Sequence, residues 1–284
     1  MPAPPTTYRR ALVTGASSGI GLALAQALLT RGIEVHGTAR AATSLAALAQ
    51  AGGAGHALDL RDDDAIASLI TALERRGGID LLINNAGYGL MAPISDARRA
   101  AVHAQFDINV AAPLSLARQL APHMAQRGYG MIVNISSISG HAPTPFGGVY
   151  SASKAALSAA SGAMRVELAP FGIRVVTVEP GAIRSHFGDR AREEAAAAVD
   201  PNGLYAGLRD AILARARISQ TNPTPADQFA QIVVKRLLDR RTPPSRIRAG
   251  RYSLTLPLAA RLLPDALLDR LLARRFGLHT LVSK

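Results

Sequence analysis

A tyrosine and a lysine stand four residues apart in the segment Tyr150-Ser151-Ala152-Ser153-Lys154. In a helix this spacing places both side chains on one face. A phenol with a pKa of about 10 transfers protons poorly at neutral pH, and a neighbouring ammonium lowers that pKa by stabilising the phenolate. Such a pair can pass a proton to or from a substrate oxygen. The chain has only three lysines beside 29 arginines, so a lysine here indicates a need for a compact charge.

Two further polar residues are candidates to assist this pair. Ser137 follows a predicted strand, where its hydroxyl can hydrogen-bond a substrate carbonyl and hold it against the tyrosine. Asn109 lies inside a predicted helix, a position for which asparagine has poor propensity. Asn109 is either a satisfied buried amide or a local perturbation of the helix that positions a water for proton relay.

A glycine-rich loop, Thr14–Gly21, follows the first predicted strand and opens the first predicted helix. Glycine lets the backbone approach a pyrophosphate, and a helix N-terminus offers free N–H groups to phosphates. The spacing is G-x-x-x-G-x-G rather than the commoner G-x-G-x-x-G. Against the alternative of a turn without a ligand, we expect a nucleotide to contact Gly15, Ser17, Ser18, Gly19, Ile20 and Gly21.

The end of the second predicted strand bears on which nicotinamide dinucleotide binds. NAD-preferring sites usually place Asp or Glu there to hold the ribose 2′-hydroxyl. This chain has Thr38 at that place and Arg40 just after it. A guanidinium binds a 2′-phosphate, which a carboxylate would repel. We therefore predict NADP(H) rather than NAD(H), unless Arg40 is an ordinary surface arginine.

Residues after the third and fourth predicted strands would complete the adenosine side of the site. Asp59 can accept a hydrogen bond from the adenine amino group while Leu60 lines the ring, although Asp59 could instead cap the next helix. The turn after the fourth strand suits a place beside the ribose, as it would suit a plain turn. From it we expect contacts by Asn85, Ala86 and Gly87.

These residues fall at the joins of an alternating pattern of elements. Helical stretches near residues 19–31, 43–51, 62–76, 97–127 and 150–170 separate strand-like runs, and Ile247 marks a short seventh strand. The alternation predicts an α/β fold with a parallel sheet covered by helices on both faces. Ligands then bind beyond the carboxyl ends of the strands. The first six strand-like runs are Ala11–Thr14, Ile33–Thr38, His56–Leu60, Leu81–Asn84, Met131–Ile135 and Ile173–Val178.

Composition narrows the function classes. The chain has 284 residues, 48% of them hydrophobic, and no cysteine, which excludes disulfides and thiolate chemistry. Of the net charge of +12, residues 240–284 carry 10 basic and 2 acidic groups, and aromatic residues make up only 4%. No nucleic-acid partner is therefore expected. The seven histidines lack metal-ligand spacing, so no metal is expected either.

The ends of the chain suggest its location. Residues 1–8 are Pro-rich, lack the apolar stretch of a signal peptide, and are expected to form a disordered tail. No run of 18 apolar residues is present, so no membrane span is expected and a cytoplasmic protein is the simplest interpretation.

Together, these residues resemble the main single-domain branch of the short-chain dehydrogenase/reductase family. The resemblance extends over about Arg9 to Ala249 and implies a Rossmann-type doubly wound sheet of about seven strands in one catalytic domain, residues 9–250. The roles that it implies are acid–base for Tyr150, ribose binder and pKa modifier for Lys154, carbonyl orienter for Ser137 and relay for Asn109. The matching positions are Thr14–Gly21, Asp59, Asn84–Gly87, Asn109, Ser137, Tyr150, Lys154 and Pro180-Gly181.

The resemblance carries further expectations. Pro180, Gly181 and Ile183 would shape the nicotinamide side, where Ser185 stands at a position at which the family often has threonine. The pair Thr38 and Arg40 resembles the branch that contains hydroxysteroid and retinol dehydrogenases. Family members need no metal and usually form homodimers or homotetramers, so a homo-oligomer is expected here.

Two segments bear on the substrate and partners. Residues 184–226 are long and Ala/Leu-rich, which indicates either a structural insertion or a lid over a roomy apolar pocket. A lid favours a bulky lipophilic substrate of the steroid, retinoid or long-chain type. Residues 251–284 form a basic amphipathic helical tail, which would dock across the pocket mouth, contact another subunit or lie on an anionic membrane surface.

The predicted reaction is hydride transfer between NADP(H) and the carbonyl or alcohol carbon of a small molecule. One alternative is a cofactor-binding sensor with an idle site, although the complete set of Asn109, Ser137, Tyr150 and Lys154 favours catalysis. Another is an oxoacyl reductase that acts on carrier-bound substrate, with the basic tail meeting an acidic carrier.

Overall fold

Seven parallel strands form one sheet in the computed structural model, which describes residues 8–185, 187–200, 202–240 and 242–282. The sheet order is β3-β2-β1-β4-β5-β6-β7, and every neighbouring pair is parallel. The predicted α/β doubly wound sheet is therefore confirmed. The strands are β1 (Arg10–Thr14), β2 (Glu34–Ala39), β3 (Ala54–Ala57), β4 (Leu81–Asn84), β5 (Gly130–Ile135), β6 (Ile173–Pro180) and β7 (Arg246–Ala249).

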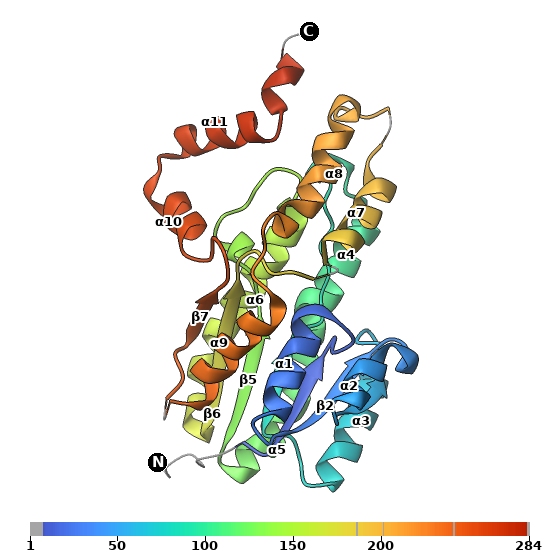
Figure 1. Cartoon of the computed structure of the whole chain (residues 1–284), viewed down its shortest axis with the longest axis vertical. Helices are drawn as coiled ribbons and strands as arrows, with labels where there is room; N and C mark the ends of the chain where they lie inside the picture. Colours follow the sequence, from blue (N-terminus) through green and yellow to red (C-terminus); the bar gives the residue numbers. More distant parts are fainter. Residues whose placement is uncertain (1–7, 186, 201, 241, 283–284) are drawn as a thin grey trace.

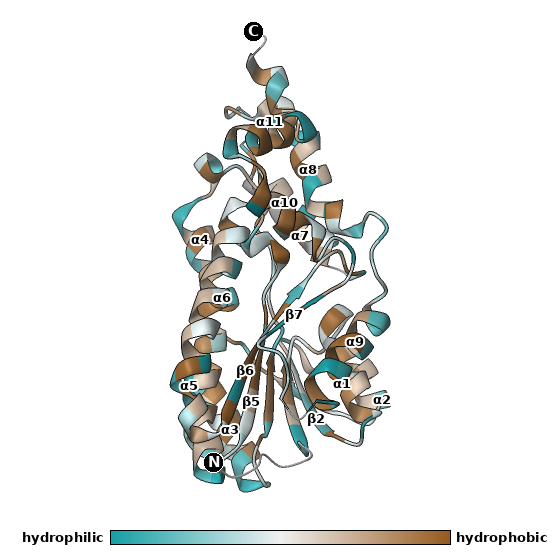
Figure 2. Cartoon of the chain, turned by 90° about the vertical axis from the view of Figure 1, so that its left-hand side faces the viewer, coloured by the Kyte–Doolittle hydropathy of each residue, from teal (hydrophilic) through white to brown (hydrophobic). Residues whose placement is uncertain are grey.

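Helices cover both faces of this sheet (Figure 2). One face carries α1 (Gly19–Leu29), α2 (Ala46–Gln50) and α9 (Ala226–Leu238). The opposite face carries α3 (Asp63–Arg75), α5 (Ala112–Arg127) and α6 (Gly148–Glu167). The strand order reverses direction between β1 and β4, which is the point where open α/β sheets bind their ligands.

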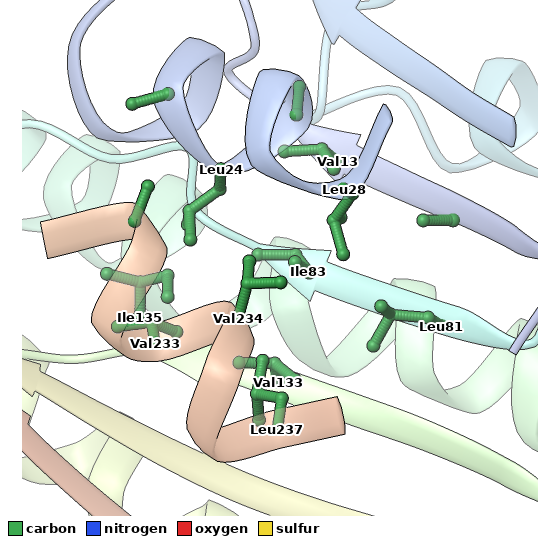
Figure 3. Packing of buried hydrophobic residues seen from close by; sticks show 14 of the residues in the cluster. Val13, Leu24, Leu28, Leu81, Ile83, Val133, Ile135, Val233, Val234 and Leu237 are labelled. Atoms are coloured by element: carbon green, nitrogen blue, oxygen red, sulfur yellow. The ribbon is translucent and has the colours of Figure 1, made fainter. Parts of the chain in front are cut away.

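Alternation along the strands divides the core into two layers. Val13 of β1 faces α1 and α9, in a cluster shown in Figure 3, whereas the adjacent Leu12 faces α3 and α5. The central strands β4 and β5 are buried along their whole length, as expected for strands covered on both sides. The strands lie between these two layers, and the site residues come directly after the carboxyl ends of the strands.

Two predicted elements differ from the structure. The third strand is Ala54–Ala57 rather than His56–Leu60, because β2 pairs with the earlier residues and the chain leaves the sheet after Ala57. The predicted single helix over 97–127 is divided by a π-helical turn, Asp107–Ala111, between α4 (Arg99–Phe106) and α5.

Further helices lie beyond the carboxyl ends of the strands (Figure 1). They are α7 (Phe187–Ala198), α8 (Arg209–Arg217), α10 (Thr255–Leu262) and α11 (Asp265–Arg275). The Ala/Leu-rich residues 184–226 contain α7 and α8. These two helices share an apolar cluster that also contains Phe146, Tyr150 and Phe276, so α7, α8 and the tail join one layer of packing.

The N-terminal expectation falls mostly outside the described residues, which begin at Tyr8. Tyr8, which the prediction placed in the tail, is buried in the hydrophobic core. No helix within the described ranges is long and apolar enough to cross a bilayer.

Candidate active site

A cavity of about 1100 Å³ lies beyond the carboxyl ends of the strands. Of the predicted site residues, all but Gly21 and Asn109 line it. Residues separated by up to 170 positions in the chain therefore share one wall. The residues brought together are Gly15, Ser17, Ser18, Gly19, Ile20, Thr38, Arg40, Asp59, Leu60, Asn85, Ala86, Gly87, Ser137, Tyr150, Lys154, Pro180, Gly181, Ile183 and Ser185.

The glycine-rich loop is braced from beneath. Gly15 has a φ of +67°, a conformation that favours glycine. A Cβ on Gly21 would lie 2.2 Å from the Gly15 carbonyl oxygen, so Gly21 supports the loop without lining the cavity. The Asn85 side-chain amide donates to the Thr14 and Gly15 carbonyl oxygens at 3.0 and 3.3 Å. Asn85 therefore fixes the loop as well as facing the cavity.

The start of α1 fits a bound diphosphate. Ser18 is the N-cap residue, but its hydroxyl makes no capping hydrogen bond, and no acidic residue occupies the first turn. The helix N-terminus thus keeps its free N–H groups and partial positive charge. Ser17, Ser18 and Gly19 place these donors on the cavity wall, so the residues present suit the phosphates of a dinucleotide.

The predicted adenosine end contains an ion pair that sequence reasoning missed. The guanidinium of Arg61 donates to Asp59 with its NH2 group 2.6 Å from Oδ2. Hydrogen bonds from Arg61 lower the pKa of Asp59 to about 2, and the nearby charge of Arg40 adds to this effect. Asp59 is therefore ionised and can accept hydrogen bonds. Thr38, Arg40 and Arg61 line the same part of the wall.

The catalytic candidates converge on the opposite part of the cavity. Tyr150 and Lys154 lie on one face of α6, and both side chains are buried. Lys154 donates from Nζ to the Ile135 carbonyl oxygen at 2.9 Å, at the end of β5. Ser137, two residues beyond that strand end, interacts with the Tyr150 phenol through its hydroxyl. Ser136 instead bonds the Lys154 carbonyl oxygen and Ser158, so it anchors α6.

Burial shifts both titratable groups of this pair away from charge. It raises the pKa of the Tyr150 phenol, while hydrogen bonding to Ser137 and the charge of Arg215 act in the opposite direction. This net direction is opposite to the lowering expected from the lysine. Burial also lowers the pKa of Lys154 to about 8. At neutral pH the phenol therefore holds its proton, which is the form that can donate to a carbonyl oxygen.

Asn109 lies in the π-helical turn and is fully buried. Its side-chain amide donates to the Tyr88 carbonyl oxygen and to Ser153 Oγ at 3.1 and 3.0 Å, and its oxygen accepts from the Tyr88 N–H. The amide is therefore satisfied, as one alternative expected, and the helix is perturbed at Asn109, as the other expected; the relay role of Asn109 stays a prediction. The side chain ties α6 to the loop after β4.

The segment after β6 is held in place by a residue that the sequence did not indicate. Gln220 accepts from the Ser185 N–H and donates to the Ile183 carbonyl oxygen, both at 3.1 Å. Gly181 donates through its N–H to the Ala249 carbonyl oxygen of β7. These bonds fix Pro180, Gly181, Ile183 and Ser185 along the cavity wall.

The roof of the cavity, defined as Met91, Phe187, Leu272 and Phe276, is apolar and was not predicted residue by residue. The Phe187 ring lies 5.3 Å from the Tyr150 ring, centre to centre. Phe276, from the tail, packs edge-on against Phe146 at 6.3 Å. Apart from the repeated leucines of the tail, no local pattern distinguishes these residues. They come together only through the packing of α7, α8 and the tail beyond the strand ends.

Charged residues from the same segments also line the cavity: Glu193 and Arg275 are exposed, whereas Arg215 is buried. Arg215 of α8 is 7% exposed and lines the wall near Tyr150. Its Nε–H donates to Thr144 Oγ1 at 2.8 Å. No sequence pattern distinguishes Arg215 from the other 28 arginines. Within the described ranges no group of three or more acidic or histidine side chains suitable for a metal ion is found.

Comparisons with known proteins point to one family. The short chain dehydrogenase family profile matches residues 9–196. An NADPH-dependent 1-acyldihydroxyacetone phosphate reductase from Saccharomyces cerevisiae is 32% identical over 277 residues, which cover 94% of this chain and 91% of that protein. A short-chain dehydrogenase from Streptomyces avermitilis superposes with a TM-score of 0.76 at 30% identity, covering 93% and 95% of the two chains. One from Sphingobium yanoikuyae, in complex with NADPH, has a TM-score of 0.67 at 28% identity, covering 96% and 95%.

Proposed function

This chain belongs to the short-chain dehydrogenase/reductase family of NAD(P)-dependent oxidoreductases, and on that premise we propose that it is an NADPH-dependent reductase of bulky lipophilic ketones or aldehydes. The observation that carries the proposal is the Tyr150 phenol, buried in the same cavity as the glycine-rich loop, where burial raises its pKa and favours the protonated form. The form of Tyr150 favours reduction, because a phenol that holds its proton is ready to donate it.

The residues around the phenol define the proton transfer. When bound, the cofactor supplies the hydride that adds to the carbonyl carbon. The Tyr150 phenol donates its proton to the carbonyl oxygen, so that C=O becomes CH–OH. Ser137 holds that oxygen by a hydrogen bond. The Lys154 ammonium, protonated below a pH of about 8, stabilises the phenolate that remains, until a solvent proton restores the phenol.

The preference for NADPH rests on the end of β2. Thr38, Arg40 and Arg61 line the cavity there. Among the described residues of this part of the wall, the carboxylate is Asp59, and it is paired with Arg61. Two guanidinium groups favour an additional phosphate. The relatives named for NADPH point in the same direction.

The preference for a lipophilic substrate rests on the roof. The roof presents apolar side chains to the cavity: Met91, Phe187, Leu272 and Phe276. Burying this surface against an apolar substrate makes the free energy of binding more favourable. The yeast relative is named for a ketone that carries an acyl chain. A steroid, retinoid or long-chain carbonyl would fill the same volume.

Replacing the acid tests the reaction. Tyr150→Phe removes the proton donor, so we expect NADPH to bind as before while turnover falls by about 10²- to 10⁴-fold. The measurements are NADPH fluorescence titration and steady-state oxidation of NADPH over a panel of lipophilic and small carbonyls. Tyr205→Phe removes a hydroxyl from the lid and serves as the matched control. Unchanged turnover in Tyr150→Phe would refute the reaction, and an idle NADPH-binding protein would show no turnover even before the change.

Removing the proposed phosphate contact tests the cofactor preference. Arg40→Ala should raise the KM for NADPH by about 10- to 100-fold, the range for losing a charged hydrogen bond, and leave the KM for NADH unchanged. Arg165→Ala, an exposed arginine on α6 outside the cavity, is the control. Equal use of NADH and NADPH by the parent enzyme would contradict the preference.

A further inference from the structure

Arg215 places a buried positive charge on the cavity wall beside Tyr150, whereas Arg275, which also lines the cavity, is exposed. Arg215 belongs to the last turn of α8, between the buried residues Ile212 and Ala216. A Cβ on Gly147, three residues before Tyr150, would lie 3.0 Å from the nearer terminal nitrogen of Arg215. The guanidinium therefore lies over the first turn of α6, beside the proton donor.

Most of the hydrogen-bonding capacity of this guanidinium is free. Its Nε–H donates to Thr144, and neither terminal nitrogen has a hydrogen-bond partner among the described residues. No carboxylate in the described part of the chain forms an ion pair with it. Glu193 lines the same cavity but is exposed and does not pair with Arg215.

An unpaired charge at this depth is costly to the free protein. Burial lowers the pKa of Arg215 to about 10, so the guanidinium still keeps its charge at neutral pH. Thr144 fixes the orientation of the side chain by holding Nε, which leaves the pair of terminal amino groups for a ligand. Two parallel N–H donors match the two oxygens of a carboxylate or phosphate.

We propose that Arg215 binds an anionic oxygen group, carboxylate or phosphate, on the carbonyl substrate. The carbonyl then meets Tyr150 and Ser137, the anionic group meets Arg215, and the apolar remainder lies under Phe187, Leu272 and Phe276. This assignment rests on the proposed reductase function and narrows its substrate class. The preferred substrates are lipophilic ketones or aldehydes that carry one acidic group, rather than neutral steroids or retinoids.

The parent enzyme gives the first test. NADPH oxidation is measured with two matched pairs: a long-chain oxo acid against its methyl ester, and a phosphorylated hydroxyketone against its dephosphorylated form. We expect the anionic member of at least one pair to have a KM lower by about 10-fold or more, the scale of one charged hydrogen bond. Which pair responds tells whether carboxylate or phosphate is bound.

Variants at the same position give the second test. Arg215→Met should abolish the preference within the responding pair and change the KM for its neutral member by less than about 3-fold. Arg215→Lys keeps the charge and should restore part of the preference. Arg209→Met, at the exposed start of α8, is the matched control and should leave both members unchanged.

Failure of this assignment differs from failure of the reductase function. Turnover with no discrimination by charge in the parent enzyme would overturn the role of Arg215, and needs no variant to fold. An equal loss of kcat for both members in Arg215→Met, with KM unaffected, would also overturn it, because Arg215 would then act only through its charge on the phenol. Absence of any Tyr150-dependent carbonyl reduction would instead refute the reductase function.

Discussion

Burial shifts the pKa values of Tyr150 and Lys154 in opposite directions, but in both residues it disfavours the charged form. It raises the pKa of Tyr150 and lowers that of Lys154 to about 8. In each case the charged form has lost its hydration without gaining a full counterion. The amine keeps one hydrogen bond, to the Ile135 carbonyl oxygen. The buried groups that would transfer the proton therefore lower the stability of the folded protein.

Lys154→Met tests this cost. The folded-state pKa of Lys154 lies below its ordinary 10.5, so its charge destabilises the fold fully below a pH of about 8 and less as the pH rises toward 10.5. The shift corresponds to about 3 kcal/mol, and the lost hydrogen bond offsets about 1 kcal/mol of it. Without cofactor, the variant should melt roughly 4 °C above the parent at pH 7.

The pH dependence separates this effect from simple repacking. The gap between variant and parent should shrink as the pH is raised from 7 to 10, followed by thermal unfolding at each pH. Lys235→Met, at an exposed position on α9, controls for the gain of a methionine and should show no such trend. A gap that is constant with pH would mean that the charge of Lys154 contributes nothing.

At the scale of elements, hydrophobic pattern predicted the strands well where both faces are covered. β1, β4, β5 and β6 begin and end within two residues of the predicted bounds. The predicted position of the edge strand β3 was wrong, because the sequence around Gly55 and Ala57 has no clear alternation of apolar and polar residues. Pairing with β2 determines where this strand lies. The hydrophobic periodicity also did not predict the π-helical turn around Asn109. Such a turn contains one extra residue, and here it is accompanied by the hydrogen bonds of Asn109 to Tyr88 and Ser153, which lie far away in the sequence.

The junction of β1 and α1 offers a prediction at this scale. Gly21→Ala would place a methyl 2.2 Å from the Gly15 carbonyl oxygen and 2.4 Å from the Asn85 amide nitrogen. Because the first contact is backbone, the loop must move, and we expect a loss of stability of about 1–3 kcal/mol. Binding of NADPH should weaken in parallel, as measured by fluorescence titration and urea unfolding.

Gly162→Ala is the informative comparison. Gly162 lies inside α6 with nothing within 4 Å of an added Cβ. The same substitution should there stabilise the protein by about 0.5–1 kcal/mol through helix propensity and leave cofactor binding unchanged. If both variants behave alike, the packing of the loop against α1 does not determine the site.

At the scale of the whole molecule, the two halves of the cavity differ in how far sequence reveals them. The floor of the cavity consists of residues that follow the strand ends and of the start of α1. The motifs that contain Gly19 and Tyr150 therefore predict its position. The roof joins residues 187 and 276, and its position depends on how the lid and tail pack. Arg215 illustrates the limit, because only burial beside Tyr150 distinguishes it from other arginines.

Shortening the chain after Leu256 tests the roof. This change removes Leu272, Arg275 and Phe276 from the cavity wall, so the KM for long-chain carbonyls should rise by about 10-fold or more, because the two apolar side chains no longer cover the substrate. The KM for small carbonyls should stay the same. Kinetics that are identical for both substrate classes would show that the tail does not contribute to binding.

The same pair of chains tests contact with a membrane. The tail exposes Leu254, Leu258, Leu262, Leu267 and Leu271 alongside its arginines. Under the proposal of an interfacial tail, the full chain sediments with anionic phosphatidylglycerol vesicles and the shortened chain does not. Equal sedimentation of both chains removes that proposal and leaves docking over the cavity or a subunit contact.

The split origin of the cavity has a consequence for how such an enzyme changes over generations. Under the proposed function, the residues that handle hydride and proton lie on loops after the strands and at the start of α6. Most residues that would meet the rest of the substrate lie in, or directly after, the helices α7, α8 and α11. Substitutions in these three helices can therefore alter what is accepted while the chemistry persists. Random libraries confined to residues 187–220 and 265–276 should yield many active variants with new scope.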